Sequence, residues 1–127
     1  MSLNEKEISA VSALSRDERL GYFIKRAADF ERVWGIDEAG WVLSALNDGR
    51  SVFQLWPFAD YAALCCVGEW ASCAPKAIDL DDFMESFLAD FEESGMLIGI
   101  FYTPHDAGAI LTASELRGFL EDELEKY

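Results

Sequence analysis

The spacing of apolar residues changes along the chain, and these changes predict where helices and strands lie. Residues 80–91 carry apolar side chains three and four positions apart, the period of an amphipathic helix, and Gly95 is a typical stop signal beyond them. Residues 20–27 repeat this period after Ser15 and Glu18, which are spaced as a capping box. The basic residues of that helix are expected mostly off its apolar stripe: Arg16, Arg19, Lys25, Arg26 and Arg32.

Two further helices are predicted at the ends of the chain. Residues 4–14 favour a short helix, with Ser2 and Glu5 spaced as a capping box. Thr112 and Glu115 form another such box before the last helix. Its expected apolar face is Leu116, Phe119, Leu120, Leu124 and Tyr127.

Alternating and continuous apolar runs predict the strands. Residues 41–47 and 50–56 flank Asp48-Gly49, a strong tight-turn signal, and therefore predict a β-hairpin between Trp41 and Trp56. Residues 96–102 (MLIGIFY) carry no charge and are apolar on both alternating faces, as in a central strand that is covered on both sides. Short strands are also expected at VWGI, KAIDL and AILT.

Trp56-Pro57 marks the change from a strand period to a helix period. The residue before a proline favours an extended backbone, and proline suits the first turn of a helix. We therefore expect a strand to end at Trp56 and a helix to follow over residues 58–66.

The predicted order is α-α-β-β-β-α-β-α-β-β-α, with hairpins and without regular βαβ alternation. This order favours a single α+β domain over residues 1–127, in which an antiparallel or mixed sheet of about five strands packs with about five helices.

Charge is distributed unevenly along the chain. The net charge is −14; residues 1–32 sum to zero, and the remaining residues hold 18 acids and four bases. An acidic surface repels phosphate backbones, so nucleic acid is not expected as a partner. A basic protein would suit this surface, and solubility is the simpler explanation of the charge.

The remaining composition favours a protein of the cytoplasm. No apolar run is long enough to span a membrane, and the first residues lack the pattern of a secretion signal. The three cysteines do not form a paired framework, so reduced thiols are expected at Cys65, Cys66 and Cys73.

Few residues point to catalysis. His105 is the single histidine, no nucleotide-binding glycine loop or nucleophile elbow is present, and the cysteine spacing does not suit a metal. We therefore expect no catalytic residue, no metal and no cofactor. An enzyme stays as an alternative in which a buried Lys76 acts as a base or Schiff-base former.

Aromatic residues near the Trp56-Pro57 joint suggest a ligand site. Tryptophan rings with an unpaired indole N–H are favoured at binding surfaces, although they also pack at sheet rims. The predicted site is an aromatic pocket with one acid and one base: Trp56, Tyr61, Glu69, Trp70 and Lys76.

Six fragments in order resemble a bacterial family of small proteins described as domain of unknown function 2750: RAADFERVWGI, GW, LWPFADYAALC, GEW, KAIDLDDFMESFL and LIGIFYTP. The resemblance covers roughly residues 20–126, and its specific part is the order and spacing of the fragments. The family has no established activity, so the resemblance implies a bacterial cytoplasmic protein and assigns no catalytic residue.

Two hypotheses of function follow. The first is a non-catalytic binding module with an acidic surface, such as an inhibitor or immunity-like protein that neutralises a basic enzyme. The alternative is a small-molecule-binding protein or enzyme that uses the aromatic pocket around Trp56, Glu69, Trp70 and Lys76. A homodimer is a further alternative for the partner.

Overall fold

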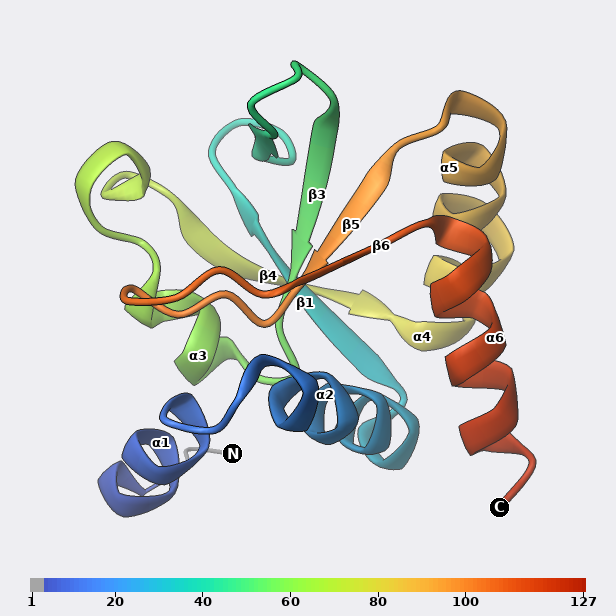
Figure 1. Cartoon of the computed structure of the whole chain (residues 1–127), viewed down its shortest axis with the longest axis horizontal. Helices are drawn as coiled ribbons and strands as arrows, with labels where there is room; N and C mark the ends of the chain where they lie inside the picture. Colours follow the sequence, from blue (N-terminus) through green and yellow to red (C-terminus); the bar gives the residue numbers. More distant parts are fainter. Residues whose placement is uncertain (1–3) are drawn as a thin grey trace.

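The computed structural model describes residues 4–127 and has the predicted order of elements (Figure 1). The α+β class is confirmed. The helices are α1 (Glu5–Ser12), α2 (Arg16–Phe30), α3 (Ala59–Leu64), the 3₁₀ turn η1 (Gly68–Trp70), α4 (Leu80–Asp82), η2 (Phe83–Phe87), α5 (Leu88–Ser94) and α6 (Ala113–Leu124); the strands are β1 (Arg32–Asp37), β2 (Leu43–Ala45), β3 (Ser51–Leu55), β4 (Ala74–Asp79), β5 (Leu97–Ile100) and β6 (Ala109–Leu111).

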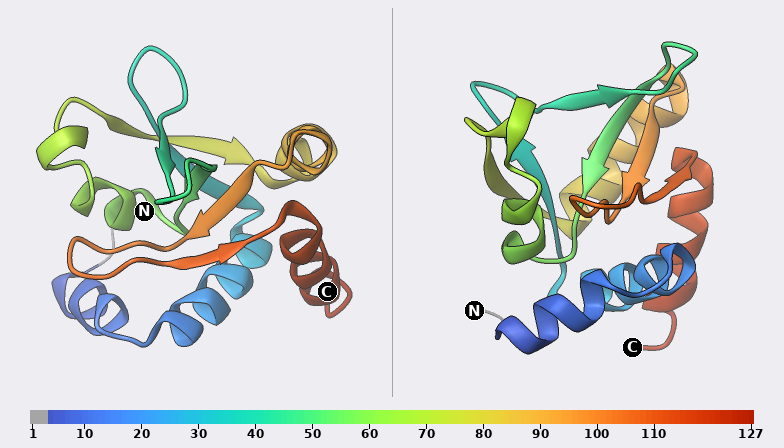
Figure 2. Two further views of the ribbon diagram at one scale, coloured as in Figure 1. Left: turned by 45° about the horizontal axis from the view of Figure 1, so that its top comes forward. Right: turned by 60° about the vertical axis from the view of Figure 1, so that its left-hand side comes forward.

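The strands form two sheets. The larger is mixed, with the order β2-β3-β5-β6, and only its β3–β5 pair is parallel. The smaller is an antiparallel pair, β1 with β4. An isolated antiparallel bridge between Trp34 and Trp56 links the two sheets through two backbone hydrogen bonds of 3.0 and 2.8 Å. Figure 2 shows that β1 runs at an angle to the strands of the larger sheet.

Local signals in the sequence account for most helix ends. The capping boxes at Ser15 and Thr112 both form. Asn4 caps α1 by accepting a hydrogen bond from the amide of Glu7. The predicted box at Ser2 lies outside the described residues.

The long apolar helix contains an unexpected π turn. The amide of Leu88 donates to the carbonyl of Phe83, five residues earlier, so that α4, η2 and α5 form one helical segment with a wide turn. The extra residue places Phe83 and Leu88 in the core together, each with no exposed surface. Phe87 and Phe91 then pack beside Phe53 of β3.

The predicted central strand and hairpin are confirmed. All four residues of β5 are buried between β3 and β6. In the β2–β3 hairpin, Gly49 has a φ of 88°, a left-handed conformation that glycine adopts without strain.

One predicted apolar face is wrong in part. Leu116 and Leu120 of α6 are buried, but Phe119 is 45% exposed and Tyr127 is 67% exposed. Helix α6 packs against α2 and α5, and these contacts cover a narrower stripe than the sequence period predicts.

Candidate functional site

The two aromatic residues at the centre of the predicted pocket are enclosed. Trp56 has 0% exposure and Tyr61 has 1%. The indole N–H of Trp56 donates to the carbonyl of Tyr102 at 2.8 Å, and the hydroxyl of Tyr61 lies 3.3 Å from that of Tyr22. Burial raises the pKa of Tyr61. In this conformation neither ring has a surface that a ligand could contact.

The other three predicted site residues lie at the surface. Glu69 is exposed and Trp70 is half-buried, both in the 3₁₀ turn η1. Lys76 is exposed on β4, with its ammonium 5.0 Å from the ring centroid of Trp41. The structure therefore brings Lys76 to a tryptophan that the sequence analysis had not assigned to the site. Ligand binding by these residues stays a prediction.

The Trp56-Pro57 joint is confirmed as a strand end followed by a helix, with one difference. Phe58 is the N-cap residue of α3, so Pro57 lies just before the helix and not in its first turn. A hollow of about 160 Å³ opens beside the joint. Its lining residues are Phe30, Arg32, Trp34, Pro57, Phe58 and Ala59.

The cysteines lack the environment of reactive thiols. Cys65 and Cys73 are buried, and all three cysteines are free. Burial raises the pKa of the Cys65 thiol to about 11, which keeps it protonated near neutral pH. Within residues 4–127, no group of three or more His, Cys, Asp or Glu side chains is placed to hold a metal ion.

A buried arginine, Arg19, fastens the start of α2 to the connection between β5 and β6. Its Nε donates to the carbonyl of Phe101 at 3.0 Å. One Nη donates at 2.9 Å both to the carboxylate of Asp106 and to the carbonyl of Ala107. The other Nη donates to the carbonyl of Leu14 at 2.8 Å. The residue thus ties α2 to the turn that precedes it and to both ends of the β5–β6 connection.

The prediction that the basic residues of this helix lie off its apolar stripe is wrong for Arg19, which is only 1% exposed. Arg19 precedes Phe23 by four residues, a spacing that places both on one face of a helix. That spacing was a usable signal. However, the sequence does not show which distant carbonyls will pair with an arginine on this face. Charged side chains are rarely buried unless paired, so the sequence alone favours a surface position.

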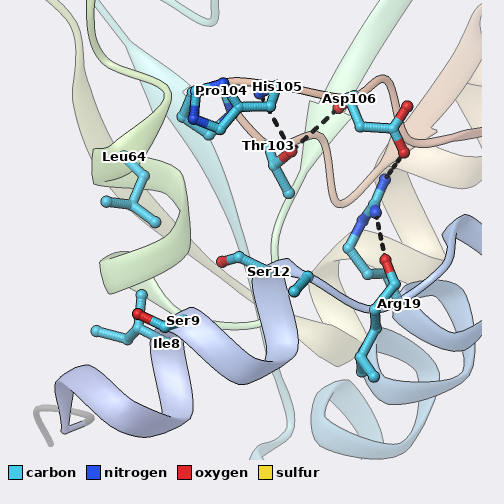
Figure 3. Close-up of a pocket in the computed structure, with 11 residues that line it drawn as sticks. Ile8, Ser9, Ser12, Arg19, Leu64, Thr103, Pro104, His105 and Asp106 are labelled. Atoms are coloured by element: carbon cyan, nitrogen blue, oxygen red, sulfur yellow. Dashed lines mark hydrogen bonds and ion pairs between the residues drawn. The ribbon is translucent and has the colours of Figure 1, made fainter.

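A pocket of about 460 Å³ lies next to Arg19, between α1, α3 and the connection from β5 to β6 (Figure 3). Helix α1 contributes Ser12, whose Oγ is buried and has no hydrogen-bond partner in the described residues. Thr103 and His105 line the opposite side, where the His105 amide donates to Thr103 Oγ1 at 3.3 Å. The remaining lining residues are Ile8, Ser9, Ala13, Leu14, Arg19, Leu64, Pro104 and Asp106.

The ion pair beside this pocket has a predictable pH dependence. The hydrogen bond from Arg19 lowers the pKa of Asp106 below its ordinary value of 3.8. The pair therefore stabilises the fold fully above that value and loses its effect as the pH falls through the lowered pKa. We expect Asp106→Asn to be less stable than the wild type at neutral pH, and the difference to disappear in acid. Urea unfolding across the acid range measures this, and a difference that does not depend on pH would contradict it.

Acidic side chains are concentrated on two helical segments that pack together. Residues 79–94 carry seven acids and no lysine or arginine, and residues 113–127 carry five acids and two bases. These segments hold a net charge of −10 out of the −14 of the whole chain. Helix α5 packs against α6 at one side of the molecule, where Arg117 pairs with Glu92 at 2.8 Å (Figure 1). We call the exposed sides of these helices the acidic face.

A groove of about 340 Å³ between α2 and α6 adjoins the acidic face. Leu20, Ile24 and the exposed ring of Phe119 give it apolar surface. Asp17 and Asp122 line it without an ion-pair partner in residues 4–127, whereas Glu123 pairs with Lys126 at 3.1 Å. The groove thus combines exposed apolar surface with unpaired negative charge, which the sequence analysis did not locate.

The fold is α+β, with a mixed four-stranded sheet and a separate antiparallel pair of strands. Residues 20–120 match the sequence profile of DUF2750, a family of proteins of unknown function. The chain belongs to this family. Neither the curated proteins nor the solved structures include a match. None of the helices in residues 4–127 is long and apolar enough to cross a membrane.

Proposed function

We propose that this protein is a non-catalytic binding module that docks a basic protein partner on its acidic face and in the α2–α6 groove. The observation that carries the proposal is the position of the groove, which places exposed apolar surface beside α6, one of the two packed helical segments that together hold a net charge of −10. An inhibitor that neutralises a basic enzyme is the form we favour. We propose the bacterial cytoplasm as its location.

Charge supports this proposal through the rate and the specificity of association. A surface of one sign steers an oppositely charged partner during encounter, and this effect weakens with salt. Asp17 and Asp122 have no ion-pair partner in the described part of the chain, so they are open to lysine or arginine side chains of another protein. Binding should therefore weaken as the ionic strength rises.

The apolar part of the groove would supply most of the affinity. Interfaces depend on a few large side chains that are buried near their centre and surrounded by a polar rim. Phe119 fits this description, because its half-exposed ring lines the groove together with Leu20, Ile24 and charged residues. We assign it as the anchor of the interface.

We expect Phe119→Ala to weaken partner binding about 30-fold, because truncating an interface anchor costs about 2 kcal/mol. The free energy of unfolding should change by less than about 1 kcal/mol, since the ring is already 45% exposed and alanine favours a helix. Isothermal calorimetry with the partner and urea unfolding of the free protein measure the two effects. A loss of binding that only follows a loss of stability would contradict the assignment.

The partner is to be identified by capture from a bacterial lysate with four forms of the protein. These are the wild type, Phe119→Ala, a groove variant that combines Asp17→Asn with Asp122→Asn, and a control that combines Asp48→Asn with Glu69→Gln. The groove variant and the control change the net charge equally. The proposal requires a basic protein that the wild type and the control retain. Phe119→Ala and the groove variant must both lose it. A partner retained by all four forms, capture of a second copy of the chain only, or no specific capture would overturn it.

A further inference from the structure

We propose that the hollow beside the Trp56-Pro57 joint binds a proline-rich segment of another protein in the polyproline II conformation. The hollow has a volume of about 160 Å³ and is lined by the end of α2, the start of β1 and the start of α3. It shares no lining residue with the α2–α6 groove, so this inference does not rest on the proposed docking function.

Aromatic rings form most of the hollow. Phe30, the last residue of α2, is 46% exposed although its ring packs in a T-shaped arrangement against Phe58, with the ring centroids 5.1 Å apart. Pro57 and Phe58 are buried, and Trp34 is half-buried. A cavity of about 150 Å³ is large enough for a benzene ring. The hollow therefore has room for a single ring of a ligand.

The two polar side chains of the hollow are hydrogen-bond donors that solvent can reach. Arg32 and Trp34 occupy alternate positions of β1, which places them on the same face of the strand. Arg32 is exposed, and its guanidinium forms no hydrogen bond or ion pair in residues 4–127. The indole N–H of Trp34 has no acceptor in this range either, and it keeps contact with solvent. Neither group can accept a hydrogen bond, so the complementary ligand carries acceptors.

Local charge favours a neutral ligand. None of the residues that line the hollow is acidic, but Asp79 stands opposite Arg32 in the β1–β4 ladder, on the same face of the sheet. The charge of Asp79 offsets that of Arg32, and the whole chain carries a net charge of −14. An anion would therefore gain little from the single guanidinium, whereas a neutral acceptor such as a peptide carbonyl pays no electrostatic penalty.

A polyproline II segment meets each of these requirements. Its carbonyls are free to accept, because this conformation has no internal hydrogen bonds, and its proline residues have no N–H that would be left unpaired. Its rings are apolar, and aromatic-lined grooves recognise such segments in other folds. An aromatic side chain on an ordinary peptide would also fill the hollow, but its backbone N–H groups would find no side-chain acceptor there.

Titration with a hexaproline peptide, blocked at both ends, tests the proposal by NMR. The four tryptophans give four indole N–H signals, and Trp34→Phe identifies the signal of Trp34 by its loss. We expect hexaproline to shift this signal in a saturable manner, with a dissociation constant of about 1 mM, as suits a contact of this size. A blocked peptide of alternating glycine and serine lacks the rings and should bind about tenfold more weakly. No saturable shift, or equal binding of the two peptides, would overturn the proposal.

Two exposed apolar residues supply a variant and its control. Phe30→Ala removes the exposed ring of the hollow and should weaken hexaproline binding about tenfold. Leu43→Ala, at a 41% exposed position of β2 outside the hollow, should leave it unchanged. Urea unfolding establishes that both variants are folded under the titration conditions. Equal hexaproline affinity in the two variants would contradict the proposed site. Binding this weak is lost in the washes of a capture experiment, so neither result depends on the basic partner.

Discussion

Arg19→Ala is expected to lower the free energy of unfolding by about 3 kcal/mol, because each buried acceptor that loses its hydrogen-bond donor costs about 1–3 kcal/mol. The substitution removes four hydrogen bonds and leaves the carbonyls of Phe101 and Leu14 without their side-chain donor, whereas Asp106 and Ala107 keep their contacts with Arg16. It also releases Phe101, whose φ of 58° lies in a region that residues other than glycine rarely adopt. Urea unfolding monitored by tryptophan fluorescence measures the loss.

Arg16→Ala is the matched control for this prediction. Arg16 contacts the same connection, donating to the carbonyl of Ala107 at 3.0 Å and to the carboxylate of Asp106 at 3.4 Å, but its side chain is 52% exposed. Exposed pairs contribute at most about 1 kcal/mol. Equal losses of stability in the two variants would mean that burial of Arg19 is not what makes its contacts strong.

Gly108→Ala is expected to be at least as damaging as the loss of Arg19. A Cβ at this position would lie 1.9 Å from the carbonyl oxygen of Ile100 and 2.6 Å from its carbon. Both are backbone atoms, so the neighbour cannot move aside by changing a rotamer. The adjacent pair Ile100–Ala109 belongs to the β5–β6 ladder, which the displacement would break. We expect a loss of about 3 kcal/mol or more of unfolding free energy.

Gly118→Ala, in contrast, is expected to raise the free energy of unfolding. Gly118 lies in α6, and a Cβ there meets no atom within 4 Å. Alanine in a helix interior is favoured over glycine by about 0.5–1 kcal/mol, so this variant should be more stable than the wild type. Thermal unfolding of the two glycine variants side by side measures both effects. A neutral Gly108→Ala variant would contradict the close approach of the two backbones.

Features determined by neighbouring residues could be predicted from the sequence. The capping boxes at Ser15 and Thr112, the turn at Gly49 and the buried strand Leu97–Ile100 all depend on short patterns, and all are confirmed. The π turn was not predicted, because one inserted residue leaves the apolar spacing of residues 80–91 almost unchanged.

Features that depend on distant segments could not be predicted in the same way. The burial of Arg19 requires the carbonyl of Phe101, 82 positions away in the sequence. The α2–α6 groove exists only because two distant helices pack together, so the sequence analysis located neither the groove nor Asp17 and Asp122 as its unpaired acids. Trp56 was assigned to a ligand site from its residue type and its place at a joint, and those signals do not distinguish a buried ring from an open one.

Hydrogen exchange of the protein with and without its captured basic partner tests the central claim most directly. The account predicts slower exchange in Arg16–Phe30 of α2 and Ala113–Leu124 of α6, and a smaller effect when Phe119 is replaced by alanine. Protection confined to other segments, such as Glu5–Ser12 of α1 and Ala59–Leu64 of α3, would contradict it and place the interface on another side of the molecule.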